Sequence, residues 1–424
     1  MKLLSLLAVA FMAVSSTVDG AGVFVQPKVG TPIPGKYIVM LKQGTAAIDS
    51  FETKFNEMSR RNRVPNAPGG GHRRKFAKIA ERLEELNGFT IVDGEDDLQE
   101  LLSLDEVNYI EQDATLKVIP DVIAGAKPAP RNGTWENLPN WGLLRISQRK
   151  RVKDECVNQR CATYKYPKQA GAGITAYVID TGIQTSHPEF EGRAYLGKNV
   201  IEGSPDTDEH GHGTYVASIL GGRLAGVAKK VSLVDVKVLN RTGYGTISGI
   251  VAGMDWVGRH ARGGSRNKRA VVNMSLIAYQ SRALHDAVSA LTNASIPVIA
   301  GAGNDPSMNP CESSPAGAPS AFAVAASNVS DSIADFSSVG KCVDIIAPGV
   351  DVYGASFNPS KLFQSASGTS VASPMVAGVA AVYMSMDRNL RTTTQIYNKL
   401  KQTATRGKIS APLFDTPNVM VYLS

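Results

Sequence analysis

The segment Gly368-Thr369-Ser370-Val371-Ala372-Ser373-Pro374 leads into an apolar run from Met375 to Met384. This run is apolar on all sides and long enough to form a helix that is buried on every face. Small residues around Ser370 leave room for its hydroxyl where a loop becomes the helix. Free backbone N–H groups and the helix dipole favour a developing oxyanion there. From this segment alone, a hydroxyl that merely caps the helix is an equally good interpretation.

Short β-rich runs alternate with helical segments from about residue 140 onward. This alternation is typical of a parallel sheet covered by helices on both faces. The sequence therefore predicts an α/β fold, a three-layer sandwich with a mostly parallel sheet. Ligands of such sheets bind outside the carboxyl ends of the strands. We expect buried strands at 174–179, 232–239, 271–276 and 297–300.

Polar side chains fall close to the ends of these strands. Asp180 ends the first strand, although aspartate is disfavoured in strand interiors. His212 lies between Gly211 and Gly213 at the start of an apolar helix, so other groups can approach its imidazole closely. Asn304 follows the fourth strand after three small residues. Taken singly, each of these residues is explained equally well by a turn or a helix cap.

The combination is more specific than its parts. Acyl transfer needs an imidazole that takes a proton from a hydroxyl and a carboxylate that orients this imidazole. It also needs a donor, such as an amide, for the oxyanion that forms. The order Asp180, His212, Ser370 is one of the known orders for this chemistry, and no G-x-S-x-G surrounds Ser370 as in α/β-hydrolases. A metal site at Glu209, His210 and His212 is disfavoured, because side chains at i and i+2 do not share a helix face.

The N-terminal part of the chain has a different character. Residues 1–20 carry an apolar stretch followed by small residues, which is typical of a secretory signal peptide cleaved near Gly20 or Ala21. Residues 35–120 indicate a small α/β unit within an N-terminal segment of residues 21–121, and we expect residues 122–424 to form the second domain. The Pro/Ala/Gly-rich segment 120–130 marks the boundary and, in an exported precursor, a processing region. An ordinary N-terminal domain that stays attached is the alternative. Strands are expected at 36–41, 89–92 and 107–111, and helices at 46–60 and 97–104.

Charge is distributed unevenly between these two units. Residues 22–121 carry 13 Lys and Arg against 16 Asp and Glu, and residues 122–424 carry 31 against 21, giving net charges of −3 and +10. Opposite charges fit two parts that dock on each other. Nucleic acid is not an expected partner, since the basic run 259–269 follows an apolar helix-like stretch and is typical of a solvated loop.

The motifs around Asp180, His212, Asn304 and Ser370 together resemble the secreted fungal subtilases of the proteinase K type. The resemblance extends over nearly the whole chain. It implies a ferredoxin-like α+β prodomain of the inhibitor type, followed by a subtilisin-like catalytic domain. The implied activity is that of a serine endopeptidase, made as an inhibited precursor that cuts itself between 118 and 132. Ser370 is then the nucleophile, His212 the general base and Asp180 the group that orients it, while Asn304 stabilises the oxyanion.

The resemblance also implies how substrate binds. An extended peptide is expected to add as a strand between two edges, with a glycine-rich pocket for the residue before the scissile bond. Ile277 replaces a glycine of the family pattern, and its β-branched side chain is expected to narrow or shift specificity. A catalytically weak homologue that binds peptides is the alternative function. The edges are Gly243, Tyr244, Gly245 and Ser275, Leu276, Ile277, and the pocket is Gly301, Ala302, Gly303.

The same likeness suggests a structural Ca²⁺, although catalysis needs no cofactor. Its ligands would be the backbone carbonyls of Pro319 and Ala321 and the carboxylate of Asp344, because oxygen donors suit calcium. Alternatively, Asp344 is an ordinary turn residue. Four cysteines allow three pairings, and closeness along the chain favours Cys156–Cys161 and Cys311–Cys342.

Export would make several Asn-x-Ser/Thr sites available to glycans in a eukaryotic host. A further match, Asn273, lies in an apolar run and is expected to be buried. We expect a secreted, extracellular monomer that contacts protein substrates and its own propeptide but no membrane. The glycan sites are Asn132, Asn240, Asn293 and Asn328.

Overall fold

The computed structural model describes residues 22–26, 30–62, 76–118, 140–153, 164–263, 269–357, 362–410 and 412–424. Several predictions concern residues outside these ranges. They are the signal peptide, the processing region beyond residue 118, Cys156, Cys161 and Asn132.

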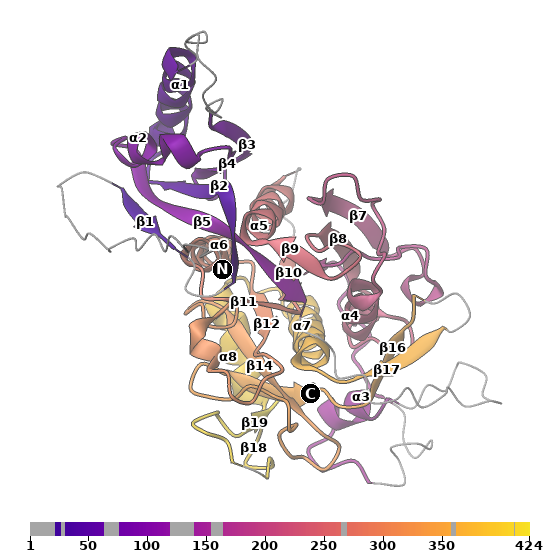
Figure 1. Ribbon diagram of the computed structural model, residues 1–424. Coiled ribbons are helices and arrows are strands. Elements are labelled where there is room, and N and C mark those ends of the chain that lie inside the picture. Colours follow the sequence, from indigo (N-terminus) through magenta and orange to yellow (C-terminus); the bar gives the residue numbers. More distant parts are fainter. Residues whose placement is uncertain are drawn as a thin grey trace, which may run out of the picture.

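A nine-stranded sheet forms the centre of the larger unit (Figure 1). All neighbouring strands in it are parallel except the last pair at one edge, as predicted from the alternation of strands and helices. The predicted strand 271–276 breaks at Ser275, which separates β10 from β11 (Leu276–Tyr279). In spatial order the strands are β18 (Thr405–Arg406), β19 (Val419–Met420), β15 (Ile345–Pro348), β14 (Phe322–Ser327), β12 (Val298–Gly301), β10 (Ala270–Met274), β6 (Thr175–Asp180), β8 (Ser232–Lys237) and β7 (Ala194–Asn199).

Helices cover both faces of this sheet, as a parallel sheet requires. One buried cluster joins the sheet to α4 (His212–Gly221), α7 (Thr369–Met386) and α8 (Thr393–Thr403). The other joins its opposite face to α5 (Ile247–Arg262) and α6 (Arg282–Asn293). Helix α7 is long and apolar enough to cross a membrane, but 89% of it is buried inside the protein, as expected for the predicted core helix. Outside the sheet lie α3 (Trp141–Ile146), β13 (Ser313–Ser314), the hairpin β16 (Val352–Ala355) and β17 (Phe363–Ala366), and two short 3-10 turns, η4 (Pro188–Phe190) and η5 (Pro310–Glu312).

The N-terminal unit is a sheet with two helices, the ferredoxin-like α+β arrangement that was predicted; its strands are antiparallel except β1, which pairs parallel to β5. The sequence did not indicate β3, and β5 extends seven residues beyond the predicted end of its strand. Its own core packs the first long helix against the sheet. The elements are β1 (Val23–Val25), β2 (Thr31–Leu41), α1 (Thr45–Asn62), β3 (Lys78–Leu83), β4 (Gly88–Val92), η1 (Glu95–Asp97), α2 (Leu98–Leu102) and β5 (Val107–Val118).

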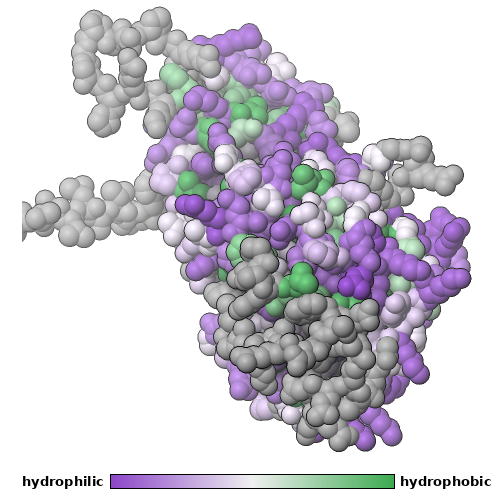
Figure 2. Space-filling view, turned by 90° about the vertical axis from the view of Figure 1, so that its right-hand side faces the viewer, coloured by the Kyte–Doolittle hydropathy of each residue, from purple (hydrophilic) through white to green (hydrophobic). Residues whose placement is uncertain are grey.

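The two units share a sheet. The end of β5 pairs with β9 (Tyr244–Thr246) on one side and with β11 on the other, so it reaches from the smaller unit into the larger one (Figure 1). On the face drawn in Figure 2, hydrophobic residues form small separate patches among hydrophilic ones. The units are in contact through this strand pairing and through a buried hydrophobic cluster that joins the smaller sheet to α5 and α6.

Candidate active site

A buried aspartate and a buried histidine form the centre of the site. Asp180 is the last residue of β6, and His212 is the first residue of α4. The Nδ1 atom of His212 and the Oδ1 atom of Asp180 are 2.6 Å apart, and both side chains are almost fully buried. Oδ1 also accepts the backbone N–H of Thr181 at 2.7 Å. A carboxylate in this position fixes the orientation of the imidazole and stabilises its cation.

Asp208 holds the loop that leads to His212, and sequence analysis did not identify it. Its Oδ1 accepts the backbone N–H of Gly211 at 2.8 Å, and its Oδ2 accepts that of Thr214 at 2.9 Å. The hydroxyl of Thr181 donates to Oδ1 at 2.9 Å. One carboxylate therefore joins the end of β6 to the start of α4. The available signal was an aspartate shortly before a helix start, the arrangement of an N-terminal cap.

Two further buried ionisable side chains lie on β8, next to β6. The Nζ of Lys237 donates to the backbone carbonyls of Thr181 and Leu239, at 2.6 and 3.2 Å. Asp235 accepts the backbone N–H of Ile183 at 2.9 Å, and burial raises the pKa of this carboxyl well above its usual range. Together these groups fix the loop that follows β6. Sequence analysis missed them because the strand was expected to contain only core side chains.

Ser370 lies in the first turn of α7 and is fully buried. Its backbone carbonyl accepts the hydroxyl of Ser275 at 2.8 Å, and that hydroxyl also bonds Ser373 at 3.0 Å. Helices α4 and α7 pack against each other on one face of the sheet (Figure 1). The structure thus joins Asp180 to His212 and carries Ser370 on the neighbouring helix.

Asn304 follows β12 and is bound to the first residue of α7. Its Oδ1 accepts the backbone N–H and the hydroxyl of Thr369, at 2.8 and 3.0 Å. The backbone N–H of Gly303 donates to the same hydroxyl at 3.1 Å. Because the Oδ1 end faces Thr369, the Nδ2 donor faces away from it. A side-chain amide held in this way is suited to donate to an oxyanion.

The predicted pocket segment packs closely against α7. A Cβ atom on Gly301 would lie 3.0 Å from the hydroxyl oxygen of Thr369, a tight contact that would require Thr369 or β12 to shift by a few tenths of an ångström. Ala302 is fully buried. Gly303 has a φ of +122°, a conformation that L side chains rarely adopt. Close packing therefore favours glycine at 301, and the backbone conformation favours it at 303.

The two predicted binding edges lie on either side of one extended segment, the end of β5. Val118 is opposite Leu276 of β11, and Leu116 is opposite Gly245 of β9. The backbone N–H of Val118 donates to the carbonyl of Gly243 at 2.7 Å. Main-chain pairing of this kind is how an extended peptide adds to exposed sheet edges.

The predicted calcium ligand Asp344 has other partners. Its Oδ1 is 2.7 Å from the Nζ of Lys401, and its Oδ2 accepts the backbone N–H of Ala323 at 2.9 Å. An ammonium group repels a divalent cation, so the carboxylate as arranged does not fit calcium. Among the described residues, no group of three or more His, Cys, Asp or Glu could hold a metal ion. Calcium at Pro319, Ala321 and Asp344 stays a prediction.

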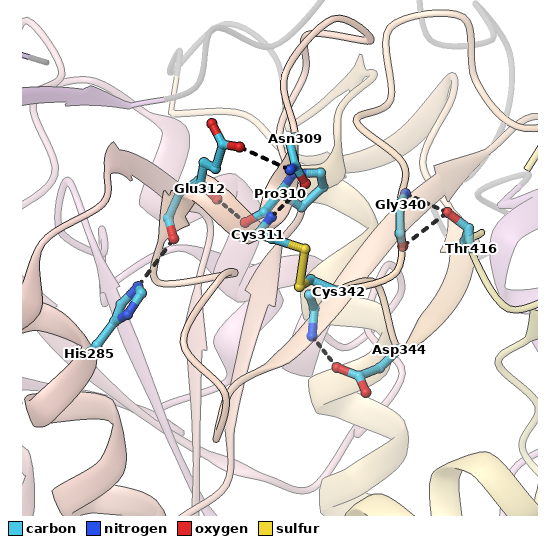
Figure 3. Close-up of a disulfide and its surroundings, with 11 residues drawn as sticks. His285, Asn309, Pro310, Cys311, Glu312, Gly340, Cys342, Asp344 and Thr416 are labelled. Atoms are coloured by element: carbon cyan, nitrogen blue, oxygen red, sulfur yellow. Dashed lines mark hydrogen bonds between the residues drawn. A yellow bond between two sulfur atoms is a disulfide. The ribbon is translucent and has the colours of Figure 1, made fainter. Parts of the chain in front are cut away.

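Cys311 and Cys342 form a disulfide with a Cα–Cα distance of 5.3 Å, as closeness along the chain predicts (Figure 3). The bridge connects the loop after Asn304 to the segment that leads into β15. Of the described glycan sites, Asn293 is exposed, whereas Asn240 and Asn328 are half-buried. Asn273 is fully buried in β10, as expected.

Comparison with known proteins gives consistent matches. The subtilase family model matches residues 171–416. Subtilisin-like protease 6 of Trichophyton verrucosum (strain HKI 0517) is 36% identical over 423 residues, covering 97% of this chain and 96% of the relative. Subtilisin-like protease 6 of Trichophyton tonsurans is 38% identical over 387 residues, covering 89% of each. The crystal structure of a cold adapted subtilisin-like serine proteinase matches with a TM-score of 0.61 and 39% identity, over 67% of this chain and 98% of that one.

A parallel α/β sandwich with an aspartate–histidine pair at the carboxyl ends of its strands defines a class of hydrolases that use a serine hydroxyl. Within this class the chain belongs to the subtilase family. It is a subtilisin-like serine protease of the proteinase K type and hydrolyses peptide bonds.

Proposed function

We propose that the protein is a secreted serine endopeptidase that works through Asp180, His212 and Ser370 and is made as an inhibited precursor. The observation that carries this proposal is the 2.6 Å contact between His212 Nδ1 and Asp180 Oδ1, at the start of the helix packed beside α7. Nδ1 bound to a carboxylate leaves Nε2 as the ring atom that exchanges a proton with a hydroxyl.

The reaction then follows from the roles of these groups. The Oγ of Ser370 attacks the peptide carbonyl while His212 takes its proton, and Asp180 stays ionised beside the imidazolium. The tetrahedral oxyanion accepts hydrogen bonds from Nδ2 of Asn304 and from the backbone N–H of Ser370. His212 gives its proton to the leaving amine, which breaks the C–N bond and leaves an acyl-enzyme. Water repeats the cycle and releases the acid.

Inhibition of the precursor is supported by the position of β5. This strand pairs with both binding edges, β9 and β11, and therefore takes the place of an extended substrate. A substrate cannot add a strand at edges that are already paired. We infer that the unit up to about residue 121 is a propeptide that blocks the cleft, and that the enzyme cuts it between 118 and 132.

Two carboxylates of β5 strengthen this docking, and sequence analysis did not identify either. The carboxylate of Asp113 accepts the backbone N–H of Ser248 at 3.0 Å and its hydroxyl at 2.6 Å, in the first turn of α5. Glu111 accepts the backbone N–H of Ala283 at 2.8 Å, in the first turn of α6. Helix N-termini carry partial positive charge, so each acid is favourably placed. This agrees with the net charges of −3 and +10 on the two parts of the chain.

A third contact is made from the opposite side of the interface. The Oδ1 of Asp255 on α5 accepts the backbone N–H groups of Glu85 and Leu86, at 2.7 and 3.3 Å. These N–H groups belong to the turn between β3 and β4. Asp255 therefore holds the propeptide at a point separate from the cleft. Export rests on the N-terminal signal sequence and is compatible with the disulfide, which persists in oxidising compartments. We propose that the released enzyme acts as a monomer on protein substrates.

The test is to express the full chain and its Ser370→Ala variant and to treat both with a serine-reactive fluorophosphonate. We expect the secreted wild-type chain to be labelled at Ser370 and to lose the N-terminal unit. The variant should be unlabelled and uncut. Mass spectrometry gives both results and locates the mature N-terminus. A folded, secreted wild-type chain without label at Ser370 would instead favour the weak peptide-binding homologue.

A further inference from the structure

Two residues at the start of β11 lie close to the site. Ser275 is in the break before β11, and Ile277 is the second residue of this strand. The hydroxyl of Ser275 contacts the carbonyl of Ser370, and Leu276 is fully buried in the core. Ile277 lines the same cavity beside β5 as Asn304, so its side chain faces the site.

The pairing of β5 shows where a substrate residue must go. Val118 is opposite Leu276, and Lys117 is opposite Ile277. A bound peptide that continues in this register has its next residue opposite Ser275, beside Ser370. Residues directly opposite in an antiparallel pair project to the same face. The side chain just before the scissile bond therefore lies on the face that carries Ile277.

On the face that carries Ile277, two side chains pack against Gly303. The δ1 methyl of Ile277 lies 3.1 Å from the position that a Cβ on Gly303 would occupy, and the ε methyl of Met308 lies 2.5 Å from the same position. Ordinary contacts between carbon atoms are 3.5–4.0 Å, so no further atom fits between these side chains and the Gly303 backbone. The Ile277 side chain thus spans the distance from β11 to the segment after β12.

The lining of the neighbouring cavity agrees with this close packing at Gly303. A cavity of about 410 Å³ opens beside β5, and its walls include Ile277, Asn304 and Met308. The segment 301–303, which lies wholly within the described residues, is not part of its walls. Ile277 and Met308 therefore stand between the open space and the glycine-rich segment.

We propose that Ile277 and Met308 close the pocket for the residue before the scissile bond, so that the enzyme cleaves after glycine, alanine or serine and excludes aromatic side chains. This inference rests on the proposed function, since it describes the specificity of that same site. A packed pocket rejects a larger side chain because insertion forces neighbouring atoms off their preferred positions. Even one methylene discriminates by about 10–200-fold. A phenyl group should therefore be rejected by at least about 100-fold.

The experiment uses two tetrapeptide p-nitroanilides that differ only in the last residue, alanine or phenylalanine. The processed enzyme is counted by fluorophosphonate labelling, and kcat/KM is measured for both substrates. Variants Ile277→Gly and Met308→Ala remove the two blocking groups separately. The control Leu196→Gly makes the same kind of change on the edge strand β7, where this side chain is 56% exposed.

For the wild-type enzyme we expect an alanine preference of at least about 100-fold. Ile277→Gly should reduce this preference at least tenfold, and Met308→Ala should reduce it by a smaller factor. Leu196→Gly should leave it unchanged. The inference would be overturned if the labelled wild-type enzyme used both substrates equally, or if Ile277→Gly kept the wild-type preference. Neither result would affect the proposed function. If Ile277→Gly does not fold, the ratio of the two kcat/KM values for the wild-type enzyme and for Met308→Ala still tests the inference. Absence of both label and cleavage would reject the proposed function itself.

Discussion

Removal of the Asp113 carboxylate tests how the proposed propeptide is held on the catalytic unit. In Asp113→Ala, the first turn of α5 loses two bonds to this carboxylate, from the backbone N–H and hydroxyl of Ser248. A hydrogen bond to a charged group contributes roughly 1.5–3 kcal/mol, and truncating one partner of a buried charged contact costs about 2–5 kcal/mol. Burial raises the pKa of Asp113, which means that desolvation offsets part of this gain. We therefore take about 2–3 kcal/mol, which corresponds to a Kd for the cut propeptide that is roughly 30–150-fold higher.

The assay uses the full chain after it has processed itself, with the cut propeptide still bound. The complex is diluted in steps, and activity toward a small peptide substrate reports the free enzyme. Asp105→Ala is the matched control, because it removes the same charge from an exposed position of the propeptide. Asp113→Ala should reach half of its full activity at a roughly 30–150-fold higher total concentration than the control. A difference of less than about threefold, below 1 kcal/mol, would refute the role of this carboxylate as a docking group.

Three further outcomes can be checked with the same preparations. Asn304→Leu should lower kcat by roughly 10²–10³ with little change in KM, because the amide acts on the oxyanion; this is measured by steady-state kinetics, and a KM effect alone would contradict it. Burial raises the pKa of Asp255 to about 6 in the complex, and release of the propeptide should return it toward about 4. Binding then takes up a proton, so propeptide affinity should fall as pH rises from about 4 to 6. Asp255→Asn should flatten this dependence, leaving the part due to the carboxylates of β5. Lys401→Ala removes the ammonium group that pairs with the Asp344 carboxylate, which leaves this carboxylate available to calcium. Millimolar calcium should therefore raise the Tm of this variant and leave that of the wild type unchanged. A calcium-dependent Tm in the wild type would show that the ion displaces Lys401.

Much of the architecture could be predicted because it depends on local pattern. The apolar run after Ser370 indicates a helix buried on all sides, and α7 extends over Thr369–Met386. The alternation of strands and helices indicates the parallel sheet. The strand β3 could not be predicted, because Lys78–Leu83 is mixed in polarity and is a strand only through its pairing with β4. The end of β5 was missed for the same reason, since its partners are edges more than a hundred residues away.

The sequence by itself determined which residue types are present, in which order, and next to which glycines, and this was enough to select Asp180, His212, Asn304 and Ser370. Only the tertiary structure decided what these side chains meet. The contact between Ile277 and Gly303 and the ion pair of Asp344 with Lys401 each join residues that are far apart along the chain. The physical reason is that helix and strand propensities act over a few residues, whereas the distance between two side chains in a site depends on how whole elements pack.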